Sequence, residues 1–201
     1  MNPPSTTERP GFDHRMTREE INQCPIRMYA GPIHIIRSRE ELLSAAQKLS
    51  REEVLGFDIE TRPSFTRGET HSPSLLQLAG KDAVFLFQLK TVKFPRQLRD
   101  LLSTPRIIKA GVALNHDIKK LKELGSFTQA GFVDLGDVAR HAGIKNHGLR
   151  GLAAVLLGFR ISKQAQVSNW ERKTLTPEQV TYAATDAWVS RELFLHMQKL
   201  M

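Results

Sequence analysis

Two acidic side chains stand inside an apolar stretch near residue 60. In the run VLGFDIET, residues 54–61, Asp58 and Glu60 lie two positions apart among hydrophobic neighbours. Because side chains alternate across a β-strand, the two acids share one face of the predicted strand, and Phe57 and Ile59 point to the other face, toward a core. The acids lie near the carboxyl end of the strand, where open α/β sheets commonly bind ligands. They are either a functional pair or part of the solvent-exposed face of an edge strand, and an exposed face would explain the same alternation.

Three further residues could act with this pair. Asp117 falls in the first turn of a predicted helix, LNHDIKKLKELG, where the helix dipole alone favours an acid. Tyr182 and Asp186 are four positions apart in TYAATDAW, so they share one face of a helix. Taken alone, each feature has an ordinary structural explanation, namely a favourable helix start and a surface pair. A joint role requires the three segments to converge.

The pattern of apolar and turn-forming residues predicts the elements that would position these groups. Ser38 caps one helix, Thr176 opens the last helix, and a hairpin turns at residues 80–82. Asn115 can cap the helix that carries Asp117. Strands are expected at residues 33–36, 53–61, 74–80, 82–89 and 106–113, helices at 39–53, 94–103, 114–125 and 177–200, short helical pieces at 132–143 and 148–159, and a loop or broken helix at 161–175.

This order of elements predicts one α/β domain with a mixed sheet covered by helices. Residues 1–30, which several prolines interrupt, are interpreted as a flexible N-terminal lead-in. The domain itself is then expected to span residues 31–201.

The composition limits the classes of protein and partner. With 201 residues and 40% hydrophobic residues, the chain can bury a real core. It contains no apolar run of the roughly 20 residues that a membrane span requires, and it has no apolar secretory signal. The single cysteine, Cys24, excludes an internal disulfide, and a cytoplasmic location is expected. A net charge of +8 favours a polyanionic partner such as nucleic acid. The oligomeric state stays open.

Taken together, the acidic segments resemble a known family. The runs FDIET, GVALNHDIKKL and YAATDA are similar to the three motifs of the DEDD superfamily of 3′→5′ exonucleases, in its tyrosine-bearing form. The chain resembles the exonuclease domain of the Werner syndrome helicase and is similar to ribonuclease D, over roughly Ile33 to Leu200. The resemblance implies an RNase H-like fold, a mixed twisted sheet with helices on both faces.

The resemblance also implies a metal-dependent mechanism. Four carboxylates in one cleft repel one another, and hard cations such as Mg²⁺ or Mn²⁺ would remove that conflict. Two ions about 3.5–4 Å apart can clamp the attacking and leaving oxygens of a phosphoryl displacement. By motif match, Asp58 would bridge both ions, Glu60 and Asp186 would complete the first site, and Asp117 would hold the second. Tyr182 would orient the attacking water.

Other residues are candidates for contact with substrate. Basic side chains near the motifs, with an aromatic ring among them, suit a single nucleic-acid strand. The alternative is that the basic residues are ordinary solvated charges and that the aromatic residue packs in the core. Leu76 could wedge against the terminal base, and its alternative is also core packing. The candidate substrate contacts are Arg62, Arg67, Leu76, Asn115, Lys163, Trp170 and Arg172.

The predicted function is therefore a two-metal-ion 3′→5′ exonuclease. It is expected to release nucleoside 5′-monophosphates from single-stranded or 3′-recessed DNA, with a place in DNA repair. One alternative is a ribonuclease D-like, RNA-processing exoribonuclease. A second alternative is a nucleic-acid-binding module of the same fold without turnover.

Overall fold

Six β-strands form one mixed sheet in the structure, a computed structural model that describes residues 9–66 and 68–198. The strands are β1 (Ile33–Ile36), β2 (Val54–Thr61), β3 (Pro73–Ala79), β4 (Val84–Gln88), β5 (Ile108–Gly111) and β6 (Phe132–Asp134). They lie in the order β1-β4-β3-β2-β5-β6. The pairs β2–β3 and β3–β4 are antiparallel, and the pairs β1–β4, β2–β5 and β5–β6 are parallel. The prediction of a mixed sheet is confirmed.

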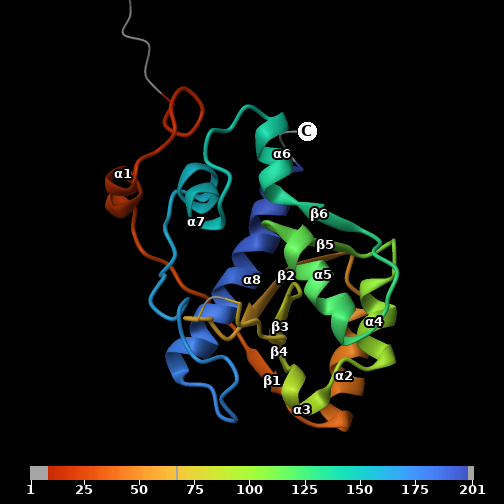
Figure 1. Cartoon of the computed structure of the whole chain (residues 1–201). Coiled ribbons are helices and arrows are strands. Elements are labelled where there is room, and N and C mark those ends of the chain that lie inside the picture. Colours follow the sequence, from red (N-terminus) through yellow and green to blue (C-terminus); the bar gives the residue numbers. More distant parts are fainter. Residues whose placement is uncertain (1–8, 67, 199–201) are drawn as a thin grey trace, which may run out of the picture.

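Helices cover both faces of this sheet (Figure 1). They are α1 (Arg18–Gln23), α2 (Arg39–Leu49), α3 (Leu89–Val92), α4 (Arg96–Leu102), α5 (Leu114–Leu124), α6 (Leu135–His141), α7 (Leu149–Leu152), the π-helical turn η1 (Ala153–Leu157) and α8 (Pro177–Met197). One buried cluster joins α2, α4 and α5 to one face of the sheet. The long helix α8 packs on the other face, with α6, α7 and η1 around it. None of the described helices combines the length and the hydropathy of a membrane span.

Strand β2 alternates between the two faces, as the sequence predicts. Phe57 and Ile59 belong to the cluster under α2, α4 and α5. Gly56 faces α8 instead, because a Cβ atom added to it would lie 1.8 Å from the carbonyl oxygen of Ala187. The face of β2 that carries Asp58 therefore lies directly against the backbone of α8.

Several segments differ from the sequence-based expectation, among them the short helix α3, which was not predicted. Residues 132–143 were expected to be helical, but the first three form the edge strand β6, and α6 begins only after Asp134. Residues 9–30 were expected to be irregular, and they contain the short helix α1, which Thr17 caps. The structure describes this segment only from residue 9 onward, and the domain boundary at residue 31 stays a prediction.

Candidate active site

Three acidic side chains from β2 and α8 meet at one place. Asp58, Glu60 and Asp186 each offer a carboxylate oxygen, and these atoms all lie within 4.8 Å of one another. The alternation of β2 puts Asp58 and Glu60 on the side of α8. The close approach of α8 at Gly56 then brings Asp186 to them. A cluster with only oxygen donors has the chemistry that hard divalent cations prefer.

All five residues predicted to do the chemistry line one cleft, which has a volume of about 940 Å³. Asp117 reaches this cleft from α5, and Tyr182 reaches it from α8. Asp117 is not one of the three acids within 4.8 Å of one another. Its charge nevertheless acts on Asp58 and Glu60, as their pKa values show. The three separated segments therefore do converge.

Burial raises the pKa values of four carboxyl groups, and the charges of neighbouring site acids add to the effect at Asp58 and Glu60. Burial, followed by the charges of Asp186 and Asp117, raises the pKa of Asp58 well above its usual range. Burial, followed by the charge of Asp58, raises the pKa of Glu60 to about 10. Burial also raises the pKa of Asp117 and that of Asp186, each to about 7. Negative charge in this cleft is therefore costly until protons or cations neutralise it.

Tyr182 lies one helical turn before Asp186 in α8. Burial, followed by the charges of Asp186 and Glu60, raises the pKa of the tyrosine hydroxyl, so the hydroxyl keeps its proton in the neutral range. A hydrogen bond with Tyr182 lowers the pKa of Asp186, against the larger effect of burial. The ring of Tyr182 packs against that of Trp170, with 5.9 Å between the centroids. Packing thus fixes a hydroxyl donor beside the acids.

The cluster fits a divalent cation. Oδ1 of Asp186 is buried and has no hydrogen-bond partner among the described residues. A buried polar atom without a partner costs about 1–3 kcal/mol, and more when it is charged. A cation would satisfy it. Because neither histidine nor cysteine belongs to the cluster, the donor set favours Mg²⁺ or Mn²⁺ over zinc.

The first turn of α5, which carries Asp117, is held by an acid that sequence reasoning missed. Oδ2 of Asp134 accepts a hydrogen bond of 2.9 Å from the Leu114 N–H. Helix α5 begins after Ala113, which has a φ of 58°, and no side chain of its own caps it. The prediction that Asn115 caps this helix is therefore wrong. Asn115 is exposed and does not line the cleft, so nothing in the structure supports its predicted contact with substrate.

The basic residues predicted to touch substrate take different positions. Lys163 lines the cleft. Arg62 lies outside it and forms an ion pair of 3.6 Å with Glu171. Arg172 is exposed and does not line the cleft. Arg67 lies outside the described residues. Of the predicted basic contacts, Lys163 is the one that the structure places in the cleft.

Two predicted substrate contacts are buried in the core instead. Leu76 has no exposed surface and packs in the cluster under α2, α4 and α5, which agrees with core packing, the alternative to a contact with the terminal base. Trp170 is 1% exposed and packs beside Tyr182 and the alanines of α8. A fully enclosed ring cannot stack on a base, and the ring of Trp170 packs against that of Tyr182 instead.

Sequence reasoning missed three arginines that line the cleft. Arg15 and Arg18 come from the segment before β1, and Arg150 comes from α7. The interpretation of residues 1–30 as a lead-in places Arg15 and Arg18 outside the predicted domain. One signal was available: Thr17 followed three residues later by Glu20 is the pattern of a helix capping box, and the structure contains that box.

The fold and the site define the class of the protein, an RNase H-like α/β domain. Two solved structures share this fold. The Nibbler EXO domain of Aedes aegypti superposes with a TM-score of 0.78 at 22% identity, covering 86% of this chain and 91% of that chain. Escherichia coli RNase D superposes with a TM-score of 0.72 at 20% identity, covering 83% and 45%.

The sequence of residues 33–201 matches the family described as 3′–5′ exonuclease, and the chain belongs to this family. The human exonuclease mut-7 homolog is 32% identical over 88% of this chain and 24% of that protein. The mouse bifunctional 3′–5′ exonuclease/ATP-dependent helicase WRN is 32% identical over 77% of this chain and 12% of that protein. The chain thus spans about a quarter or less of these two relatives. The predicted resemblance to DEDD exonucleases is confirmed.

Proposed function

We propose that this chain is a two-metal-ion 3′→5′ exonuclease that removes nucleoside 5′-monophosphates from the 3′ end of DNA, single-stranded or 3′-recessed. The observation that carries the proposal is the meeting of Asp58, Glu60 and Asp186, whose ligand atoms lie within 4.8 Å of one another. Membership of the 3′–5′ exonuclease family supports it. The raised pKa values of these acids fit a site that requires cations.

Each acid has a distinct role in this proposal. Asp58 would hold both cations, Glu60 and Asp186 would complete the first site, and Asp117 would serve the second. Mg²⁺ or Mn²⁺ at these sites would supply positive charge to stabilise the phosphate during in-line displacement and to activate water. Asp117 lies apart from the other three acids, which fits a separate second site.

Tyr182 completes the site as a positioning residue and would place the chain in the tyrosine-bearing subgroup. Its hydroxyl keeps its proton at neutral pH and lies beside Asp186. The hydroxyl can therefore hydrogen-bond the attacking water and hold it in line with the scissile phosphate. Because Trp170 packs against the ring, the hydroxyl is held in one place.

A second candidate substrate is RNA. Escherichia coli RNase D, which shares the fold, is described as an exoribonuclease involved in structured RNA processing. The acidic cluster would serve either polymer, because it acts on the phosphodiester that both share. A preference would come from contacts with the ribose 2′-hydroxyl.

The test compares 5′-labelled DNA and RNA oligonucleotides of one sequence, each single-stranded and as a 3′-recessed duplex, with Mg²⁺ and with Mn²⁺. We expect a ladder of products that shortens stepwise from the 3′ end of DNA, and no ladder with Asp58→Ala or in EDTA. A ladder from RNA alone would establish the second candidate. Binding in EDTA without cutting under either ion would indicate a non-catalytic binding module, and full activity in Asp58→Ala would refute the proposed site.

A further inference from the structure

Part of the wall of the active-site cleft is basic, although the cleft also holds the cluster of acids. Arg15, Arg18, Arg150 and Lys163 all line the cleft. Within residues 9–66 and 68–198, none of these four side chains forms an ion pair with a carboxylate. Basic groups that line a cleft without acidic partners are available to an anionic ligand.

Arg150 lies close enough to Arg160 and Arg18 for their positive charges to act on it. Burial, followed by the charges of Arg160 and Arg18, lowers the pKa of Arg150. Its Nε is buried and has no hydrogen-bond partner among the described residues, while Nη2 donates a hydrogen bond of 2.5 Å to Oδ1 of Asn22. A buried guanidinium N–H without an acceptor is costly. An oxyanion in the cleft could supply the missing acceptor and offset the repulsion.

The segment that carries Arg15 and Arg18 is fixed to the domain by Asn146, which binds the backbone of Met16. The Met16 N–H donates to Oδ1 of Asn146 at 2.9 Å, and Nδ2 of Asn146 donates back to the Met16 carbonyl at 3.1 Å. Asn146 is 4% exposed, so water competes little for these bonds. The backbone that carries both arginines is therefore held in register with the cleft.

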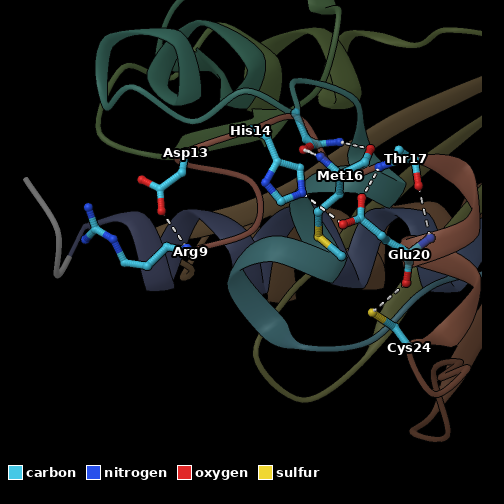
Figure 2. Close-up of polar contacts among 8 residues, drawn as sticks. Arg9, Asp13, His14, Met16, Thr17, Glu20 and Cys24 are labelled. Carbon is cyan, nitrogen blue, oxygen red and sulfur yellow. Dashed lines mark hydrogen bonds and ion pairs between the residues drawn. The ribbon is translucent and has the colours of Figure 1, made fainter. Parts of the chain in front are cut away.

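Helix α1 fixes the next turn of this segment. Figure 2 shows the reciprocal capping box: the Glu20 N–H donates to Oγ1 of Thr17, and the Thr17 N–H donates to Oε2 of Glu20. His14 also contacts Glu20, at 2.9 Å. Glu20 is thus engaged in the cap and forms no ion pair with Arg18 in the part of the chain that the structure describes.

The far end of the segment pairs with the chain beyond η1. The Arg160 N–H donates to the Pro25 carbonyl, and the Arg27 N–H donates to the Arg160 carbonyl, each at 2.9 Å. The Tyr29 N–H then donates to Oγ1 of Thr185 in α8, at 3.0 Å. Because it is anchored at both ends, this segment forms a fixed part of the cleft wall.

We propose that Arg15 and Arg18, together with Arg150, form a phosphate-binding surface. This surface binds the nucleic-acid backbone on the 5′ side of the scissile bond. This inference rests on the proposed function. Guanidinium groups match phosphate oxygens with paired hydrogen bonds, and such contacts fix the register of a strand without reading its sequence. The cleft of about 940 Å³ extends from the acids to these arginines, so one strand can meet both.

The test is the double variant Arg15→Gln/Arg18→Gln in the full chain, because both side chains are exposed and the variant should fold. Binding of a fluorescent 12-nucleotide single strand is measured in EDTA from 50 to 300 mM salt. We expect the Kd to rise at least 10-fold. The dependence of log Kd on log salt should become shallower by about 1.4, since each lost phosphate contact on a single strand removes about 0.7 from the slope. The KM for stepwise digestion should rise with a smaller change in kcat.

The matched control is Arg39→Gln/Arg51→Gln, which removes the same charge from the α2 side of the molecule, away from the cleft. We expect this variant to keep the salt slope of the unmodified chain. The inference is overturned if the Arg15→Gln/Arg18→Gln variant keeps its Kd and slope, or if the control loses as much. Since binding is read without turnover, failure of the proposed function would appear separately, as a chain that binds but does not shorten DNA.

Discussion

A Cβ atom on Gly56 would lie 1.8 Å from the carbonyl oxygen of Ala187 and 2.8 Å from the backbone nitrogen of Arg191. Strand β2 and helix α8 thus touch backbone to backbone at Gly56. Asp58 follows two residues later on the same face of β2, and Asp186 directly precedes Ala187. This contact therefore sets the distance between the acids of the candidate site.

The first prediction follows from this contact. Gly56→Ala should force α8 away from β2, because the obstructing atoms are backbone and cannot rotate aside. We expect a loss of about 3 kcal/mol in the free energy of unfolding, at the upper end of the usual cost of overpacking. We also expect at least 10-fold weaker Mn²⁺ binding. Urea denaturation and Mn²⁺ titration measure the two effects.

Gly148→Ala is the matched control for stability, because a Cβ atom at Gly148 meets nothing within 4 Å. It should change the free energy of unfolding by less than about 1 kcal/mol. If Gly56→Ala cost no more than this control, the close contact would not position the acids.

The second prediction concerns pH in the absence of metal. The raised pKa values mean that the folded protein keeps protons that the unfolded chain releases near pH 4. This contribution to stability is fully present below about pH 4. It is lost as pH rises through about 7, for Asp117 and Asp186, and through about 10, for Glu60.

Thermal unfolding in EDTA from pH 5 to pH 9 measures this effect. The Tm should fall with rising pH, and millimolar Mn²⁺ should raise it most at the alkaline end. Asp58→Asn should flatten the decline in EDTA and reduce the gain from Mn²⁺. A Tm in EDTA that climbed over this range, with the same slope in Asp58→Asn, would show that burial and the neighbouring charges do not raise the pKa values of these acids.

The third prediction concerns the hydroxyl of Tyr182. Tyr182→Phe keeps the ring that packs against Trp170 but removes the donor beside Asp186. We expect kcat to fall about 100-fold, the lower end of typical proton-transfer and positioning effects, with little change in KM or in Mn²⁺ affinity. Steady-state digestion of a labelled oligonucleotide gives both constants. An unchanged kcat would remove Tyr182 from the mechanism.

The fourth prediction concerns a buried lysine outside the site. The side chain of Lys109 is fully buried, and its Nζ donates to the carbonyls of Thr104 and Ile107. Burial lowers its pKa to about 8. The folded state therefore carries a cost for the charged form that is fully present below about pH 8 and is relieved as pH rises toward the unfolded value of about 10.4.

Comparison with Lys109→Met isolates this cost, since methionine has similar volume and no charge. Between pH 8 and pH 10, the stability of the unmodified protein should rise relative to that of the variant. Denaturation curves across this window provide the measurement, and a constant difference would contradict the assignment.

The sequence predicted the features of the fold that depend on local pattern. The alternation around Asp58, the Ser38 and Thr176 helix caps, and the hairpin at residues 80–82 all appear in the structure. Each of these is specified by residues within one turn or one strand. The three acid-bearing motifs were also informative, because their order matched a known family.

Features that depend on long-range contacts were not predictable in the same way. The three-residue strand β6 is recognised by its pairing with β5, and it is too short to show a period of its own. The segment before β1 is ordered by partners such as Asn146, 130 positions from Met16. Trp170 is enclosed by packing that no local pattern records. For these reasons the sequence predicts the acids of the candidate site, but it does not predict that Arg15, Arg18 and Arg150 line the same cleft.

Whether Asp58, Glu60 and Asp186 bind a divalent cation is tested most directly by the anomalous scattering of manganese from crystals of this chain soaked in Mn²⁺. We expect density among the carboxylates of Asp58, Glu60 and Asp186, and none there in crystals of Asp58→Asn. Density elsewhere, with an empty acidic cluster at saturating Mn²⁺, would contradict this expectation.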